Sequence, residues 1–289
     1  MKNNHIKHLF ELSLATLFIS TSGALGKFID LPTPVIIWWR SSLALLFLFV
    51  FCRYKKINLK LKPKDRGTFI ISAIFLGAHW ITYFYALKLS NVALGLLSLY
   101  TFPVIATLLE PLFMKVKFDP IHIVLGFMVL LGIYILAPEL DIESSNVKGV
   151  LLGLLSALCY ALRILILKRH VANYNGTMLM LYQLLILTIV LSPVLYFMDT
   201  STISTQYPYI LLLALLTTAI GHTMFVHSLK YFSASTASII SSALPIYGIF
   251  IAYLFLGEVP NWNIFFGGLL IISTVIIESI RSKNKAKNK

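Results

Sequence analysis

Long apolar stretches alternate with short polar connections along the whole chain. Ten stretches of about 17–23 residues have the length that a helix needs to cross the hydrocarbon core of a bilayer. They lack the apolar–polar alternation of membrane β-strands, which favours helices. The predicted spans are 9–29, 33–52, 67–87, 90–110, 121–137, 147–167, 177–197, 208–228, 234–256 and 262–280. We therefore expect an all-α integral membrane protein with ten transmembrane helices.

The composition of the 289 residues supports this prediction. Hydrophobic residues make up 58% of the chain, charged residues only 12%, and the mean hydropathy is +0.85. Soluble domains carry about 25% charged residues, and disordered chains have low hydrophobicity. A water-soluble enzyme and a disordered chain are both poor fits to these values.

The positive charges follow the predicted topology. The net charge is +13, and nineteen of the 24 lysines and arginines fall in connections on one face of the membrane, whereas Lys27, Lys88 and Lys148 fall on the other. Cytoplasmic loops collect Lys and Arg, so we expect both the N-terminal segment 1–8 and the basic tail 281–289 in the cytoplasm. Because the loops account for the charge, we expect no nucleic-acid partner. The predicted location is the plasma or inner membrane.

Motifs for catalysis and cofactor binding are missing from the sequence. Cys52 and Cys159 lie in or at the end of apolar runs, and no Cys/His spacing indicates a metal site. No GxxxxGK[ST], GxSxG or HExxH pattern occurs. The sequence therefore predicts no catalytic residue, no cofactor and no metal.

An internal repeat becomes visible when the chain is shifted by 142 residues. Pro103 then meets Pro245, and Gly126 meets Gly268, with no gap. The repeat unit has five predicted helices, and this odd number makes the second copy cross the membrane in the opposite sense. Inverted repeats are typical of transporters that hold substrate near the midplane. The two prolines predict paired helix bends beside a central cavity, although a tolerated kink is the alternative.

Several motifs carry a resemblance to a known family. They are Tyr83–Ser90 with Phe102-Pro103-Val104 in the first half, and Ser233–Ala237 with Leu244-Pro245-Ile246 and Phe255-Leu256-Gly257-Glu258 in the second. Trp39-Arg40 also looks like the family's arginine-bearing helix. The sequence resembles the EamA family of the drug/metabolite transporter superfamily, as two EamA-like halves at 9–137 and 147–280. The first half departs from the pattern, with Val116 at the position of the acid Glu258. The resemblance implies transport of a small metabolite, amino acids among the candidates, with export favoured.

Charged residues inside predicted spans need a reason, because burying a charge in a bilayer is costly. Arg40 lies about 10 Å into the second span at 1.5 Å per residue. It is a candidate ligand for a substrate carboxylate, or it reaches back to the headgroups. Glu11 is a candidate proton-coupling carboxylate, or an interfacial acid paired with Lys7. Arg163, near a span end, fits a headgroup anchor.

Histidines and aromatic residues supply the other candidates. His79 and His222 lie at nearly matching depths, and either they carry protons or they are neutral hydrogen-bonding residues. The further candidates for lining a substrate cavity are Trp80, Tyr83, Tyr100 and Gln183.

Three functions fit these features. The favoured one is a secondary transporter that works by alternating access, with the bilayer and a small-molecule substrate as partners and a proton or sodium ion as coupling ion. The second is an integral-membrane enzyme that uses Glu11, His79 or Glu110 on a lipid. The third is a structural or channel-like protein.

Overall fold

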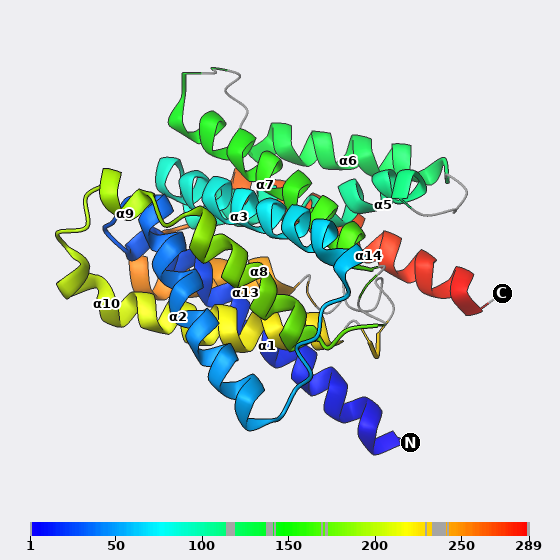
Figure 1. Cartoon of the computed structure of the whole chain (residues 1–289). Helices are drawn as coiled ribbons and strands as arrows, with labels where there is room; N and C mark the ends of the chain where they lie inside the picture. The colour runs from blue at the N-terminus through cyan, green and yellow to red at the C-terminus, as the bar shows by residue number, and fades with distance from the viewer. Residues whose placement is uncertain are drawn as a thin grey trace.

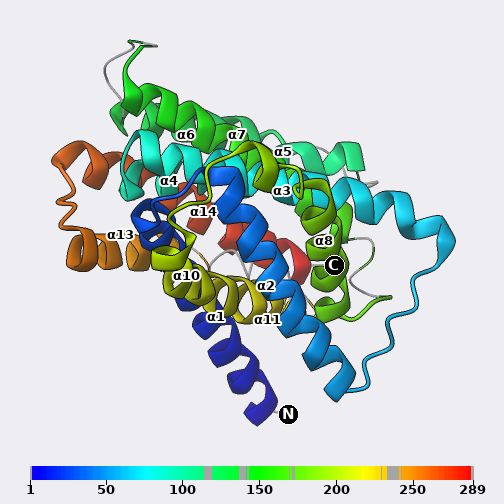
Figure 2. The same ribbon diagram turned by 60° about the vertical axis from the view of Figure 1, so that its left-hand side comes forward.

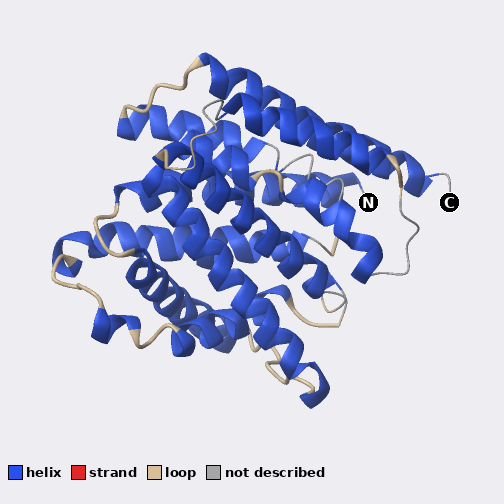
Figure 3. Ribbon diagram, turned by 90° about the horizontal axis from the view of Figure 1, so that it is seen from above, coloured by secondary structure: helices blue, strands red, loops and turns tan. Residues whose placement is uncertain are grey.

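The computed structural model describes residues 2–113, 119–136, 141, 143–168, 170, 173–228, 230–232, 241 and 243–287. Every regular element in these ranges is a helix (Figure 3). Val116, Ser233–Ala237 and the first residues of the ninth predicted span lie outside the described residues.

Helix occurs within each of the ten predicted spans. In the first half the elements are α1 (Lys2–Phe28), α2 (Thr33–Tyr54), η1 (Pro63–Asp65), α3 (Arg66–Leu89), α4 (Val92–Leu99), α5 (Phe102–Phe113) and α6 (Ile121–Leu136). In the second they are α7 (Ser145–Lys168), α8 (Gly176–Val190), α9 (Val194–Phe197), α10 (Ile203–Leu212), η2 (Leu213–His222), α11 (Thr223–Ser228), α13 (Ala243–Leu256) and α14 (Trp262–Lys287).

Seven stretches of the described chain are long and apolar enough to cross a membrane. They are Lys7–Phe28, Thr33–Tyr54, Pro63–Leu89, Val92–Phe113, Ser145–Lys168, Gly176–Phe197 and Ile203–Ser228. Three shorter apolar helices cover Ile121–Leu136, Ala243–Leu256 and Trp262–Glu278. These helices make the chain a multi-pass membrane protein, while the ten-helix, two-repeat arrangement stays a prediction.

Helices of the two predicted halves are interleaved. α3 packs along α7, and α1 packs along η2 and α13; α4 contacts both α7 and α13. Figure 2 shows α6 and α7 along the top of the bundle and α1, α10 and α11 below, and both termini lie at the right-hand end of Figure 1. The repeat matches α1 with α7, α3 with η2 and α4 with α13. By this matching, the contact between α3 and α7 corresponds to the contact between η2 and α1. Exchange of two like halves would produce such paired contacts.

The fourth predicted span is interrupted before its proline. α4 ends at Leu99, Thr101 closes a tight turn onto the carbonyl of Ser98, and Pro103 is the second residue of α5. Proline suits the first turn of a helix because no partner is needed there for its missing N–H. Pro103 therefore lies in the first turn of a new helical segment, where the sequence predicted a bend within a continuous helix. Pro245 lies within α13, and residue 242 directly before this element is outside the described residues.

The Leu256-Gly257-Glu258 motif joins the ends of two helices. Gly257 has a φ of 68°, a left-handed conformation that favours glycine, and it turns the chain after α13. The Glu258 carboxylate then accepts a hydrogen bond of 2.8 Å from the backbone N–H of Val92, at the start of α4. A carboxylate at this end satisfies an unpaired N–H and interacts favourably with the helix dipole. The motif thus caps a helix of the opposite half.

We expect Glu258→Ala to lower the free energy of unfolding by about 0.5–2 kcal/mol, the range for loss of a helix cap. Glu258→Gln keeps an acceptor oxygen and should lose less. Denaturant unfolding of the protein in detergent micelles measures both variants. Equal stability of the alanine variant and the parent would contradict the capping role.

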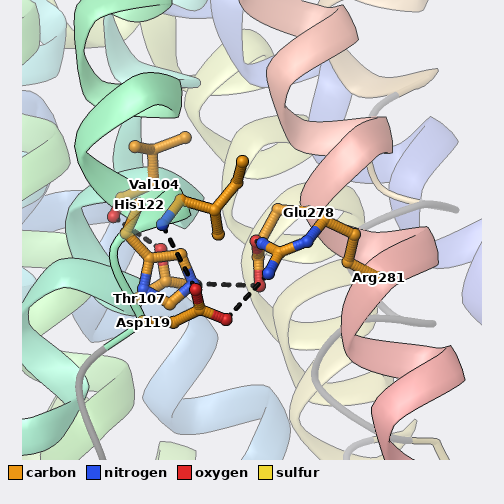
Figure 4. Close-up of polar contacts among 7 residues, drawn as sticks. Val104, Thr107, Asp119, His122, Glu278 and Arg281 are labelled. Carbon is orange, nitrogen blue, oxygen red and sulfur yellow. Dashed lines mark hydrogen bonds and ion pairs between the residues drawn. The ribbon is translucent and has the colours of Figure 1, made fainter.

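Ion pairs tie the end of α14 to the start of α6. His122 Nε2 lies 3.2 Å from Glu278 Oε1, and Arg281 contacts Asp119 at 2.7 Å and Glu278 at 2.9 Å (Figure 4). Helix α14 continues to Lys287, so most of the basic segment that follows the tenth predicted span is helical. Lys and Arg have good helix propensity, which lets the basic segment extend the helix.

Candidate functional site

A cavity lies between helices of both predicted halves. Its volume is about 40 Å³, enough for a few waters, since one water needs about 10–15 Å³. Sites that enclose small molecules have volumes of about 300–1,000 Å³. The cavity is therefore smaller than a typical small-molecule site. The lining residues are Thr16, Ile19, Ser22, Arg40, His79, Trp80, Tyr83, Leu96, Leu99, Tyr100, Phe102, Tyr160, His222, Phe225, Ser241 and Leu244.

Six of the residues selected from the sequence line this cavity, namely Arg40, His79, Trp80, Tyr83, Tyr100 and His222. All six are buried in the described structure. Arg40 is only 1% exposed, so its alternative role as a headgroup anchor does not hold. The structure thus brings together polar side chains from α2, α3, η2 and the α4–α5 connection.

Among the described residues that line the cavity, Arg40 alone carries a permanent charge. Its guanidinium donates from Nε to Thr218 Oγ1 at 2.6 Å and from Nη2 to Thr217 Oγ1 at 3.1 Å. The carbon Cζ lies 4.0 Å from the ring centre of Trp80, a cation–π contact. Within the described residues Arg40 forms no ion pair. A buried cation without a counter-ion is costly, which suits a site for an anionic ligand.

A π-helical segment presents the two threonines to Arg40. Leu213–His222 is wound more widely than an α-helix, and such segments are frequent at functional sites. In an α-helix, adjacent side chains diverge by about 100°, given 3.6 residues per turn. The wider turn brings the neighbouring hydroxyls of Thr217 and Thr218 toward one guanidinium. His222, the last residue of the segment, also lines the cavity.

His79 has a defined hydrogen-bonding arrangement. Ser156 Oγ donates to the His79 carbonyl oxygen at 2.9 Å and lies 2.7 Å from His79 Nδ1. A serine hydroxyl has a single proton, so Nδ1 must be the donor in the second bond. The network therefore assigns the proton to Nδ1 and leaves Nε2 as an acceptor. The ring also packs against Tyr160, 4.5 Å between centres.

Several polar atoms of the cavity wall form no well-defined hydrogen bond within the described structure. They are Trp80 Nε1 and His222 Nδ1, together with Tyr83 Oη, Tyr100 Oη and Ser241 Oγ, of which Tyr83 interacts with Ser22 and Tyr100 with Ser241. Buried polar groups are satisfied in the great majority of cases, so a cluster of exceptions indicates water or a ligand. The cluster contains both donors and acceptors, which suits a small polar solute.

The remaining sequence candidates lie elsewhere. Gln183 is fully buried but is absent from the cavity wall; its amide donates to Ser72 Oγ at 2.9 Å. Pro103 and Pro245 do not line the cavity, although their neighbours Phe102 and Leu244 do.

Glu11 lies near the start of α1, outside the central cavity. Its carboxylate is 3.9 Å from Lys7 Nζ and 2.9 Å from His8 Nδ1, and its side chain is 34% exposed. This placement agrees with the interfacial ion pair, one of its two predicted roles.

Arg163 is the buried group that the sequence interpretation misplaced. Its position five residues before the end of α7 suggested a headgroup anchor, but the side chain is 1% exposed. Its Nε and Nη2 atoms donate to Gln183 Oε1 at 3.2 Å and 2.8 Å. Spacing along one helix cannot show whether an arginine near its end faces lipid or a neighbouring helix.

Comparison with known proteins agrees with the family resemblance of the sequence. The profile of the EamA-like transporter family matches residues 8–137 and 147–280. Two relatives are pseudopaline exporters CntI of Pseudomonas aeruginosa, from strains UCBPP-PA14 and PAO1. Each is 23% identical to this chain over 273 residues, 93% of this chain and 95% of the relative. A solved structure described only as "Crystal structure of protein" has a TM-score of 0.69 and 14% identity over 96% of both chains, a likeness of fold alone.

A multi-pass helical bundle with a buried polar cavity between its halves has the architecture of a membrane transporter. The chain belongs to the EamA-like transporter family, because the family profile covers nearly all of it. The bilayer and a small-molecule substrate follow from this membership.

Proposed function

We propose that this protein is a secondary transporter that exports a small, amino-acid-like metabolite bearing a carboxylate. The observation that carries the proposal is Arg40, a buried guanidinium on the cavity wall without an ion-pair partner in the described structure. Carboxylates are the natural bidentate partners of guanidinium groups. Trp80, Tyr83, Tyr100, His79 and His222 supply hydrogen-bonding groups for the rest of the solute.

The proposed mechanism is alternating access between two inverted five-helix halves with both termini in the cytoplasm. The paired helix contacts and the shared cavity support this arrangement, since such transporters hold substrate between their repeats. The small cavity must widen to admit a solute, which requires the halves to move. Export is proposed because the relatives are exporters and the resemblance favours that direction.

Transport by the purified protein in liposomes tests the proposal. The probes are radiolabelled L-alanine, L-norvaline, L-glutamate and succinate, each measured by counterflow against the same unlabelled compound. We expect saturable flux of at least one carboxylate that disappears in protein-free vesicles. Absence of flux for all four, or chemical conversion of the vesicle lipids, would contradict the proposal, and lipid conversion would favour an enzyme.

Proton coupling is proposed through His79, with His222 as its partner in the cavity; sodium is the alternative ion. Asparagine in place of His79 can keep a donor toward Ser156 Oγ, but it cannot take up a proton near neutral pH. We expect His79→Asn to abolish stimulation of flux by a pH gradient while counterflow continues. Flux that is insensitive to imposed proton gradients in the parent protein would remove the proton role, and sensitivity to a sodium gradient would replace it.

A further inference from the structure

A second buried arginine lies next to the cavity. Arg163 projects from α7, and its Cζ is 5.6 Å from the ring centre of Tyr160, which lines the cavity. The Tyr160 ring packs between the rings of His79 and Phe102, at 4.5 Å and 4.8 Å between centres. One aromatic side chain thus separates Arg163 from the cavity.

The partners of Arg163 are neutral. Two of its N–H groups share the single amide oxygen of Gln183, and a third points to Met180 Sδ at 3.1 Å, a weak acceptor. The Tyr160 hydroxyl is a further neutral hydrogen-bond partner of Arg163. In the part of the chain that the structure describes, Arg163 has no ion-pair partner. A buried cation that is hydrogen-bonded only to neutral groups keeps most of its affinity for an anion.

The 142-residue repeat matches Arg40 with Tyr182 and Arg163 with Thr21, so the two arginines come from different helices of the repeat unit. Arg40 is the eighth residue of α2 and contacts threonines of η2, while Gln183, near the repeat position of Arg40 on α8, contacts Ser72 of α3. Arg163 also contacts Gln183 and so belongs to this second set of contacts. In the predicted topology, α2 begins at the outer face and α7 ends at the inner face. Each half then contributes one guanidinium, on opposite sides of the midplane.

We propose that Arg163 is a second anion-binding position, which makes the carrier selective for substrates with two carboxylates. One carboxylate binds Arg40, and the other binds Arg163 once the Tyr160 ring turns aside. This inference rests on the proposed function and specifies its substrate class. It assigns to Tyr160 the role of a partition between the two positions.

Matched pairs of compounds test the inference. L-glutamate and L-norvaline share a five-carbon chain, and succinate and butyrate share a four-carbon chain; each pair differs by one carboxylate. Binding is measured on the purified protein in nanodiscs, as the concentration that gives half-maximal thermal stabilisation. An added charge-assisted contact is worth about ten- to hundredfold in affinity. We expect the dicarboxylate of each pair to bind more tightly than its partner by that factor.

Three variants distinguish an effect of the positive charge of Arg163 from an effect on folding. Arg163→Gln removes the cation, and the ratio of dicarboxylate to monocarboxylate affinity should fall to about one. Gln183→Glu keeps Arg163 but supplies a carboxylate at its amide position, and this internal counter-ion should lower the ratio as well. Arg163→Lys keeps the charge and should retain part of the preference. The melting temperature without ligand shows whether each variant is folded. If Arg163→Gln is not folded, the affinity ratio of Gln183→Glu tests the inference in its place.

The outcomes distinguish this inference from the proposed function. A ratio unchanged by both Arg163→Gln and Gln183→Glu would overturn the role of Arg163, as would absence of binding by glutamate and succinate. L-norvaline binding that depends on Arg40 would still support the proposed function in either case. No binding by any of the four compounds would overturn both.

Discussion

Arg40→Gln is expected to lower transport efficiency by about a hundredfold or more, equivalent to about 3 kcal/mol. The glutamine side chain can still contact the hydroxyls of Thr217 and Thr218, but the substitution removes the fixed positive charge that Arg40 supplies, the only one among the described residues of the cavity wall. The substrate carboxylate then loses its charged partner in a buried setting. Initial rates in liposomes over a range of substrate concentrations give kcat/KM for the variant and its parent.

The lysine variant is the matched control for this experiment. Lysine keeps the charge but lacks the planar guanidinium that contacts two hydroxyls and stacks on Trp80. We expect Arg40→Lys to retain intermediate activity, between the parent and Arg40→Gln. Unchanged efficiency in Arg40→Gln, with the variant still folded, would show that the carboxylate binds elsewhere.

Gly153→Leu is expected to destabilise the bundle by about 3 kcal/mol or more, since α7 and α4 approach closely at this point. A side-chain Cβ at Gly153 would lie 2.5 Å from Ser98 Cβ and 3.6 Å from the Gly95 carbonyl oxygen. The Ser98 Cβ is fixed to its backbone, so the helices must separate. Small residues permit this close packing in membrane helices. The midpoint of denaturant unfolding and the yield of monodisperse protein report the effect.

The same substitution at an open glycine controls for the leucine itself. Nothing lies within 4 Å of a Cβ at Gly67, in the first turn of α3, so Gly67→Leu should unfold near the parent midpoint. A smaller change at the same place, Gly153→Ala, allows a double-variant test. Adding Ser98→Gly removes the opposing Cβ and should restore part of the stability that Gly153→Ala loses. Independent effects of these last two changes would contradict a direct contact.

The sequence predicted those buried polar residues that lie well inside an apolar run, because the free-energy cost of placing them in a bilayer can be recognised from the linear sequence alone. A charge or histidine well inside an apolar run must face protein or water. Arg40, His79 and His222 were identified in this way, and all three line the cavity. The helix positions followed from apolar length, and the interruption near Pro103 from a proline within a span.

Other features depend on packing that no local pattern records. Thr217 and Thr218 are unremarkable in a membrane helix until a π-helical turn directs both hydroxyls to Arg40. Gln183 was expected on the cavity wall, but the helical face that it occupies points to Arg163 instead. A shift of one residue turns a side chain by about 100° around a helix. The depth of a residue in the membrane can therefore be predicted from the sequence more easily than the direction in which its side chain points.

The two unpaired arginines also have an electrical consequence. In the proposed alternating-access cycle, an empty carrier with two buried positive charges responds to the membrane potential, by about 2.3 kcal/mol per charge for each 100 mV traversed. A negative cell interior favours the empty conformation in which these charges are nearer the cytoplasm. A doubly negative cargo cancels the response, so the loaded carrier reorients without opposing the voltage. If the proposed direction of export holds, the resting potential returns the empty site to the cytoplasmic face, where the substrate would bind.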